Sequence, residues 1–351
     1  MQIVTEIMTT KIFEPTEENL IDAAKIIAAG GLVAFPTETV YGLGADAMNP
    51  EAVGKVYAAK GRPSDNPMIV HVARASDISL LTSELSKTIV TLIDTFWPGP
   101  LTLIVKRKPN VPDVTTGGLD TVGVRLPDSD IARKLIEYSG CPIAAPSANL
   151  SGSPSPTRAQ HCIDDLDGRV DCIIKGPDCR VGIESTVLDV TGDVPTILRP
   201  GIITAEQISA ALDMEVEYDK SLFVRPEARP SGAGLDAGFS ADFKPKSPGM
   251  KYKHYAPKAD MIIVEGARDR VEAEIQRLKG LNEGIGNKVG VILFEEKAFV
   301  EAAHEFFADL REMDKTGVDL ILAGALSDTS QVGFAVMNRM LKSAGYNIVK
   351  V

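Results

Sequence analysis

The stretch LVAFPTETVYGLGAD, residues 32–46, places an apolar run directly before a segment rich in hydroxyl groups. Its first four residues predict a buried strand, and the proline that follows predicts the end of that strand. Immediately before it, residues 16–29 carry apolar residues at helical spacing behind Thr16, which predicts an amphipathic helix capped by that threonine. A helix that leads into a buried strand is typical of α/β proteins.

The same alternation continues along the first two hundred residues. Apolar runs bounded by Pro and Gly predict strands at 68–72, 101–105, 121–127, 143–146, 172–175 and 185–190. Helical spacing predicts helices near 50–61, 84–96 and 130–140. The order follows no strict strand–helix alternation, so we expect a mixed sheet covered by helices, with a domain that spans residues 12–212.

The last third of the chain has a different character. Residues 218–258 are rich in Pro, Gly, Ser and Lys, which predicts a linker over residues 213–258. The tyrosines and the histidine of KYKHYAPK (251–258) are unusual for an inert spacer. Strand and helix patterns then alternate regularly over residues 259–351, which predicts a small Rossmann-like parallel α/β domain. Its first strand is not followed by GxGxxG, so the dinucleotide fingerprint is absent.

Composition and charge exclude several classes of protein. The 351 residues are 44% hydrophobic and 24% charged, which is ordinary for a folded protein. A formal net charge of -11 argues against a protein whose main role is to coat nucleic acid. The sequence has no apolar run long enough for a membrane span and no signal peptide pattern, so we expect a cytoplasmic protein with no membrane partner. Its four cysteines include no CxxC pair, which favours reduced thiols.

Common catalytic signatures are missing, and the candidate residues lie on short loops. The segment KGRPSDNP (60–67) presents Lys60 and Arg62 after a predicted helix end, which indicates either an ordinary solvated helix terminus or a site for a polyphosphate. The segment APSANLSGSPSPT (145–157) offers Ser147, Asn149 and Ser155 to a phosphate or ribose, or forms a plain Ser/Pro surface loop.

Charged and polar residues also interrupt predicted strands. Arg125, inside the apolar GVRLP, indicates either a carboxylate clamp or an ion pair with one of the many acids. Ser185 begins one strand, where it binds a ligand or caps an edge, and Arg199 precedes a proline that fixes its loop. His71, in MIVHV, is either a ligand-binding residue or a satisfied core histidine.

These motifs occur in a family order. PTETVYGLG, KGRPSDNPMIVHV, WPGPLTLIV, VGVRLP with PSANLSG, and STVLDV with LRPG together resemble the YrdC-like family. The linker SPGMKYKHYAP and the small last domain are similar to its long two-domain branch, the threonylcarbamoyl-AMP synthases. The motifs cover residues 12–203, and the last 90 residues match mainly in size and pattern. The resemblance implies a YrdC-like mixed twisted sheet.

The resemblance also implies a reaction and a set of binding residues. The family condenses L-threonine, bicarbonate or CO2, and ATP into L-threonylcarbamoyl-AMP and pyrophosphate, the first step of threonylcarbamoyladenosine modification of ANN-decoding tRNAs. It needs no protein nucleophile, and Lys60 and Arg62 would position the substrates. Mg2+ would accompany ATP, with no protein ligand assigned. The implied threonine-binding residues are Thr39, His71, Arg125, Ala145 and Ser185. The implied ATP-binding residues are Lys60, Arg62, Asn66, Thr121, Ser147, Asn149, Ser155 and Arg199.

The family form further implies a lid and transient partners. Residues 32–35 would deliver the hydroxyls of Thr37 and Thr39 to a cleft, and Gly42 and Gly44 would keep the following turn close to the ligand. The linker would close over the active site, with Tyr252 and Tyr255 as lid residues that exclude water. Contact with tRNA or with the downstream threonylcarbamoyl transferase would be transient.

Two other functions are compatible with a YrdC-like fold. One is an RNA-binding module without adenylate synthesis, which the acidic net charge weakens. The other is a carbamoyl-transfer domain of the hydrogenase-maturation type, which would require partner domains and zinc-finger cysteines that this sequence lacks.

Overall fold

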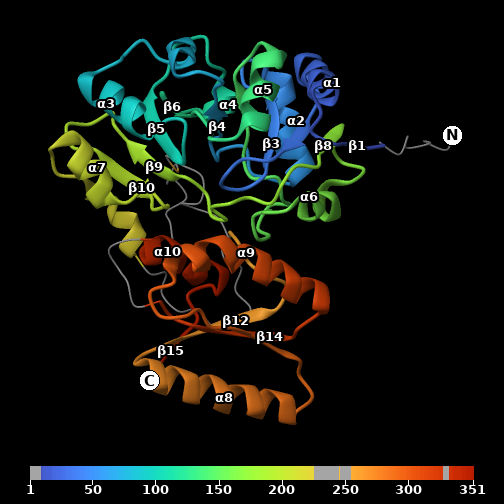
Figure 1. The fold of residues 1–351 in the computed structure, drawn as a ribbon, viewed down its shortest axis with the longest axis vertical. Coiled ribbons are helices and arrows are strands. Elements are labelled where there is room, and N and C mark those ends of the chain that lie inside the picture. Colours follow the sequence, from blue (N-terminus) through green and yellow to red (C-terminus); the bar gives the residue numbers. More distant parts are fainter. Residues whose placement is uncertain (1–8, 225–244, 246–253, 327–331) are drawn as a thin grey trace.

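The computed structural model describes residues 9–224, 245, 254–326 and 332–351, which form a large first domain and a smaller C-terminal domain (Figure 1). A mixed sheet runs through the first domain in the order β1-β8-β2-β3-β7-β4-β6-β5-β9-β10-β11. Its strands are β1 (Lys11–Phe13), β2 (Val33–Phe35), β3 (Gly42–Asp46), β4 (Ile69–His71), β5 (Leu101–Lys106), β6 (Thr121–Arg125), β7 (Ile143–Ala144), β8 (Cys172–Ile174), β9 (Thr186–Asp189), β10 (Thr196–Arg199) and β11 (Glu217–Tyr218). Parallel and antiparallel pairs are interspersed, for example β4 with β6 and β5 with β6. The predicted mixed α/β sheet is confirmed.

Helices cover this sheet and show the end signals that the sequence predicted. They are α1 (Glu17–Ala28), α2 (Pro50–Lys60), α3 (Lys87–Phe96), α4 (Asp113–Thr116), α5 (Asp130–Ser139), α6 (Ala159–Leu166) and α7 (Ala205–Leu212), with the 3-10 turns η1 (Ala75–Leu80) and η2 (Lys220–Phe223). The Thr16 side chain accepts a hydrogen bond from the backbone N–H of Asn19 at the start of α1. Helix α2 ends in Gly61, whose φ of 62° is the left-handed conformation that glycine adopts without strain.

The prediction for residues 42–44 is wrong in one respect, because they form a strand and not a turn. Strand β3 pairs antiparallel with β2, so residues 36–41 are the connection that carries the two threonines. A Cβ at Gly42 would lie 3.3 Å from Cζ of Phe35, and one at Gly44 would lie 2.7 Å from its Cε1. The glycines therefore make room for the Phe35 ring across the neighbouring strand.

Four parallel strands in the order β13-β14-β12-β15 form the sheet of the C-terminal domain, as predicted. They are β12 (Asp260–Glu265), β13 (Val289–Ile292), β14 (Leu320–Gly324) and β15 (Ile348–Lys350). The helices are α8 (Arg268–Gly284), α9 (Phe299–Thr316) and α10 (Val332–Ser343). In Figure 1, α9 and α10 lie between this sheet and the first domain, and α8 covers the opposite face.

The two domains share a hydrophobic cluster. Val40 and Ile183 of the first domain pack with Tyr255 and with Phe306 and Phe307 of α9. Gly182 leaves so little space that a Cβ there would lie 2.4 Å from the carbonyl oxygens of residues 303 and 304. These contacts fix α9 directly against the loop between β8 and β9.

Polar contacts cross the same boundary. Arg311 of α9 contacts Asp165 at 2.8 Å and donates to the carbonyl oxygen of Pro154 at 2.6 Å. In the predicted linker 213–258, residues 217 and 218 pair with β10 and so extend the first sheet. Within the described part of the chain, no helix is both long and apolar enough to cross a membrane.

Candidate active site

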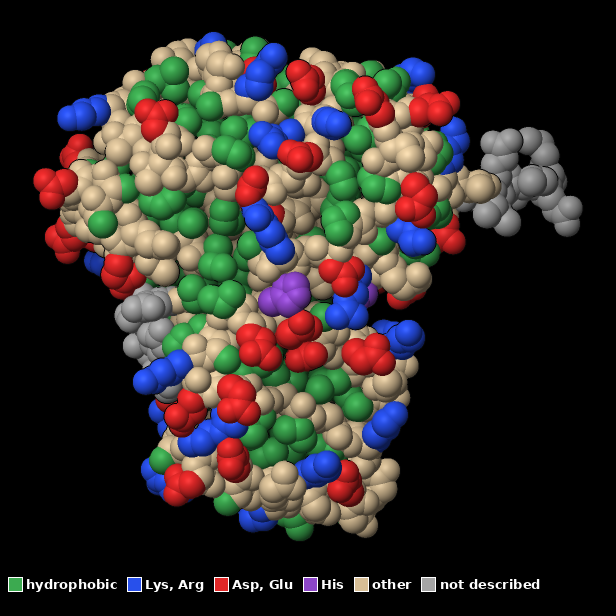
Figure 2. Space-filling view, viewed as in Figure 1, with side chains coloured by type: hydrophobic (Ala, Val, Ile, Leu, Met, Phe, Trp, Pro, Cys, Tyr) green, Lys and Arg blue, Asp and Glu red, His purple; other side chains and the backbone are tan. Residues whose placement is uncertain are grey.

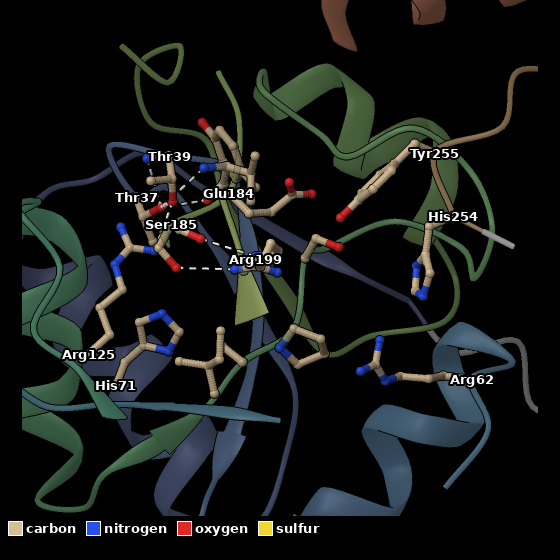
Figure 3. Close-up of a pocket in the computed structure, with 17 residues that line it drawn as sticks. Thr37, Thr39, Arg62, His71, Arg125, Glu184, Ser185, Arg199, His254 and Tyr255 are labelled. Carbon is tan, nitrogen blue, oxygen red and sulfur yellow. Dashed lines mark hydrogen bonds between the residues drawn. The ribbon is translucent and has the colours of Figure 1, made fainter. Parts of the chain in front are cut away.

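A cavity of about 60 Å³ lies where the first domain meets the segment that carries His254 and Tyr255 (Figure 3). Strands β4 and β6 are parallel and place His71 beside Arg125, because these residues are partners in the register at the ends of both strands. The other walls come from the β2–β3 connection, the segment after β7, and the ends of β9 and β10. The polar residues around it are Thr37, Thr39, Tyr41, Arg62, His71, Arg125, Ser147, Glu184, Ser185, Arg199, His254 and Tyr255.

Arg125 is buried and has partners on three sides. Its Nη1 donates to Thr39 Oγ1 at 2.9 Å and its Nε donates to the carbonyl oxygen of Gly99 at 3.2 Å. Its Nη2 lies 2.6 Å from Oε1 of Glu38, a charge contact without hydrogen-bond alignment. The structure thus shows the ion pair that the sequence offered as one alternative, and because Arg125 also lines the cavity, the carboxylate clamp stays a prediction. Glu38 had no predicted role, although it stands between the two threonines.

The hydroxyls of Thr37 and Thr39 form a directed chain. Thr37 Oγ1 donates to the carbonyl oxygen of Val40 at 2.6 Å, so in its 2.9 Å contact with Thr39 Oγ1 it is the acceptor. Thr39 therefore donates to Thr37 and accepts from Arg125. Its remaining lone pair can accept one hydrogen bond from a ligand donor such as an amine or a hydroxyl.

His71 is buried in the wall of the cavity and packs edge-on against Phe35, with ring centroids 6.4 Å apart. Burial, and next the positive charge of Arg125, lower its pKa to about 3. The imidazole is therefore neutral at physiological pH. Its Nδ1 has no hydrogen-bond partner among the described residues, so it is available to a ligand.

Ser185, Glu184 and Arg199 form the wall beside β9 and β10. Arg199 donates from Nε to the carbonyl oxygen of Ser185 and from Nη2 to its hydroxyl, both at 3.1 Å. Glu184 accepts from Ser155 at 2.5 Å and from Arg339 of α10 at 3.1 Å. Burial alone would raise the pKa of Glu184, but Arg339 and then Arg199 hold it below its usual value. Glu184 and Arg339 had no assigned role in the sequence analysis.

The predicted phosphate-binding residues separate into two groups. Arg62, Ser147 and Arg199 line the cavity. Arg62 donates to the carbonyl oxygen of Pro67 at 3.1 Å, while its buried Nε has no hydrogen-bond partner among the described residues. Burial is the main reason that its pKa falls to about 10, so it remains a cation.

The other predicted ATP residues do not line the cavity. Lys60 is buried and its Nζ donates to the carbonyl oxygens of Ser147 and Asn149. Its pKa is well below the usual value, mainly through burial and next through Arg62. Asn66 and Ser155 are also buried, and Thr121 begins the strand that ends at Arg125. Lys60 thus supports the loop that carries Ser147.

One of the two predicted lid residues can be placed. Tyr255 lines the cavity with its ring centroid 5.1 Å from that of Phe307, and its φ of 64° is unusual for a tyrosine. His254 precedes it, with the two ring centroids 5.5 Å apart. Tyr252 lies outside the described residues. Burial, as the largest cause, raises the pKa of Tyr255 to about 12 and lowers that of His254 well below its usual value, so both side chains are uncharged at neutral pH.

The geometry joins two kinds of binding surface in one cavity. Arg125, Thr39 and His71 suit a small molecule with a carboxylate and hydrogen-bonding groups. Arg62 and Arg199 suit an anion such as a phosphate chain. Within the described ranges, no group of three or more His, Cys, Asp and Glu residues is arranged to hold a metal ion.

Family models and known proteins match nearly the whole of this chain. A family model described as "Telomere recombination", for Sua5, YciO and YrdC proteins, matches residues 25–201. A second, described as "Threonylcarbamoyl-AMP synthase, C-terminal domain", matches residues 203–345. The threonylcarbamoyl-AMP synthase of Pyrococcus abyssi is 46% identical over 94% of this chain and 95% of its own length. That of Bacillus subtilis is 45% identical over 95% of each.

A solved structure extends the agreement to three dimensions. The crystal structure of P. abyssi Sua5 complexed with L-threonine superposes with a TM-score of 0.87 at 44% identity, over 98% of this chain and 99% of that one. The likeness covers the mixed sheet, the C-terminal domain and the motifs that surround the cavity. The chain therefore belongs to the YrdC-like family, in its long two-domain branch of threonylcarbamoyl-AMP synthases.

Proposed function

We propose that this protein condenses L-threonine, bicarbonate or CO2, and ATP into L-threonylcarbamoyl-AMP with release of pyrophosphate. The observation that carries the proposal is a single cavity with a carboxylate-binding wall at Arg125 and anion-binding side chains at Arg62 and Arg199. Relatives named threonylcarbamoyl-AMP synthase match nearly the whole chain, and the similar P. abyssi Sua5 has been solved in complex with L-threonine. The enzyme is thus a transferase in the pathway of threonylcarbamoyladenosine modification of tRNA.

At the threonine end, Arg125 binds the substrate carboxylate as a charge-assisted clamp. Thr39 accepts one hydrogen bond from the substrate, and neutral His71 and Ser185 contact its polar atoms. The Cβ of Ala145 closes this side of the cavity. Because the pKa of His71 is low, the wall carries no second positive charge that would repel the substrate amine.

At the ATP end, Arg62 and Arg199 contact the phosphate chain and Ser147 donates from its loop. Lys60, Asn66, Asn149, Ser155 and Thr121 act from behind the wall or at its margin. Mg2+ would enter with ATP, coordinated by the phosphate oxygens, and would screen their charge. The reaction takes place in the cytoplasm, and contact with tRNA or with the downstream transferase is transient.

The reaction needs positioned substrates and no protein nucleophile. The amine of threonine adds to CO2 and loses a proton, which gives a carbamate. A carbamate oxygen then bonds to the α-phosphorus of ATP as the bond from that phosphorus to the bridging oxygen breaks, and pyrophosphate leaves. The cavity contributes by holding the two anionic reactants together and by stabilising charge on the phosphates.

The segment at His254 and Tyr255 acts as the lid of this site. The cavity of about 60 Å³ is far smaller than the roughly 300 to 1,000 Å³ of a pocket for a drug-sized ligand. ATP therefore enters when this segment moves away from the first domain. Its return excludes water from the adenylate, which hydrolysis would otherwise destroy.

The test is pyrophosphate release from ATP, Mg2+ and bicarbonate with threonine, serine, valine or no amino acid. Release that depends on threonine and disappears without bicarbonate is the expected result. Release that ignores the amino acid, or tRNA binding without release, would contradict the proposal. The alternative of an RNA-binding module gains no support from the relatives, which are named as synthases over nearly their full length. On the face that Figure 2 draws, basic and acidic side chains are interspersed over both domains.

A further inference from the structure

The side chain of Arg339 on α10 is fully buried, yet its contacts leave the C-terminal domain and reach the wall of the cavity. Its Nε donates to Glu184 Oε2 at 3.1 Å and its Nη2 donates to the Glu184 carbonyl oxygen at 3.4 Å. Its Nη1 donates to the carbonyl oxygen of Pro200 and, at 3.2 Å, to that of Ala335 in its own helix. A guanidinium removed from water in this way requires partners on every side, and here most of them belong to the first domain.

The partners of Arg339 stand next to residues of the cavity. Glu184 precedes Ser185, and Pro200 follows Arg199, so one guanidinium joins the two segments that carry them. Figure 3 shows Glu184 and Arg199 near each other in the cavity wall. The C-terminal domain therefore supplies a fixed connection between a predicted threonine-binding residue and a predicted ATP-binding residue.

The charge of Glu184 explains why the connection matters. Its carboxylate lines a cavity that has to accept anionic phosphates, and a free carboxylate there would repel them or pair with Arg199. Its Oε1 is held by Ser155 and its Oε2 by Arg339, while Arg199 bonds to Ser185 instead. Arg339 thus holds the carboxylate in an orientation that leaves the Arg199 guanidinium open to a ligand.

We propose that Arg339 is a positioning residue of the adenylation site: from the C-terminal domain it holds Glu184 away from Arg199, so that Arg199 binds the phosphate chain of ATP. This inference rests on the proposed function for the identity of the nucleotide. It assigns the C-terminal domain a part in ATP binding through one side chain that does not itself touch the substrate.

The experiment compares Arg339→Met with the double variant Arg339→Met/Glu184→Gln in the full chain. We expect the single variant to raise the KM for ATP about 10- to 100-fold, with a much smaller change in kcat and in the KM for threonine, because the released carboxylate competes for Arg199. The double variant should return the KM for ATP to within about threefold of wild type, because a neutral amide does not compete. A merely structural role would instead change kcat and the KM for threonine together with the KM for ATP, so the selective change and recovery of the KM for ATP is the decisive readout.

Arg311→Met is the matched control, since Arg311 also joins the domains through a carboxylate but touches no residue that lines the cavity. It should weaken domain packing without the selective rise in the KM for ATP. An equal effect of both single variants on the KM for ATP, or a double variant no better than Arg339→Met, would overturn the proposal.

Calorimetric titration with ATP separates this proposal from the proposed function, because it needs no turnover. Wild type that binds ATP but releases no pyrophosphate with threonine would refute the synthase and leave the Arg339 comparison readable. If Arg339→Met does not fold, ATP affinity is measured in the double variant, which buries no unpaired charge. ATP affinity near wild type is then expected, and weak binding by a folded double variant would overturn the inference.

Discussion

Replacing Arg125 by methionine removes the carboxylate clamp, but it also leaves Glu38 without its charge partner. The two side chains are 4% and 1% exposed, so the pair is shielded from water. Breaking one half of such a pair costs about 3 to 5 kcal/mol of stability. The single variant therefore combines a loss of substrate binding with a loss of folding free energy, and the double variant Arg125→Met/Glu38→Gln is needed to separate them.

The magnitude follows from the contacts that Arg125 can offer. A hydrogen bond to a charged group contributes about 1.5 to 3 kcal/mol, and a clamp of two such bonds, part of which replaces existing contacts, contributes about 3 to 4 kcal/mol. At about 1.4 kcal/mol per tenfold change, this corresponds to threonine affinity about 100- to 1,000-fold weaker. Affinity for ATP should stay within about threefold, because Arg62 and Arg199 are unchanged.

The assay is calorimetric titration of L-threonine, L-threoninol and ATP into each variant, with thermal unfolding measured in parallel. Threoninol lacks the carboxylate, so wild type should discriminate against it by the same 100- to 1,000-fold, and the double variant should bind both ligands alike. Arg133→Met, which removes an arginine of α5 that does not line the cavity, is the control. Threonine affinity restored in the double variant, or wild type that binds threoninol as tightly as threonine, would refute the clamp.

Three further predictions concern buried side chains around the cavity. Lys60→Met removes the two hydrogen bonds to the carbonyl oxygens of Ser147 and Asn149 and should weaken ATP binding about 10- to 30-fold, with threonine binding little changed. If calorimetry gives the variant the same ATP affinity as wild type, Lys60 does not support the loop of Ser147 for ATP binding. Tyr255→Ala should lower the free energy of unfolding in urea by about 3 to 5 kcal/mol. Tyr255→Phe keeps the ring contact with Phe307 and should lower it by less than about 1.5 kcal/mol. Equal losses in the two variants would show that the ring contact is not the cause. In the unfolded chain His71 is protonated near its ordinary pKa of about 6.5, whereas in the folded protein its pKa is about 3. Below about pH 6.5 the unfolded state therefore binds the extra proton, and the free energy of unfolding of wild type relative to His71→Gln should fall as the pH drops, by up to about 1.4 kcal/mol per pH unit. Urea unfolding between pH 4 and 7 measures it, and a constant difference would disprove it.

The repeated local patterns were sufficient to predict the fold class. Helix α1 begins after Thr16, the predicted N-cap, and α2 ends at Gly61, the predicted helix end. Strand β3 was missed because Gly42 and Gly44 are typical of turns, and their packing against Phe35 depends on a residue of another strand. Local sequence indicates which backbone conformations a residue favours, whereas contacts across the sheet determine which strands pair.

The candidate site was predictable where a polar residue interrupts an apolar strand. Arg125 and His71 are such residues, and parallel pairing of β6 with β4 brings them together. The burial of Lys60 and Arg339 was not predicted, although their spacing from buried apolar residues places both on the buried face of a helix. Lys60 follows the buried Val56 by one turn, and Arg339 follows the buried Ala335 in the same way. Their partners in the first domain lie 87 to 155 residues away in the sequence, beyond the reach of any local pattern.

The apolar contact of Val40 and Ile183 with α9 also affects how the chain matures during translation. Ile183 leaves the ribosome 127 residues before Leu310, the last buried apolar residue of α9, which at typical elongation rates takes roughly 6 to 25 s. Throughout that interval the first domain exposes the apolar side chains of Val40 and Ile183, because α9 has not yet been synthesised. Slow codons between residues 184 and 310 would lengthen the exposure, so the yield of native enzyme should depend on the tempo of synthesis across this segment.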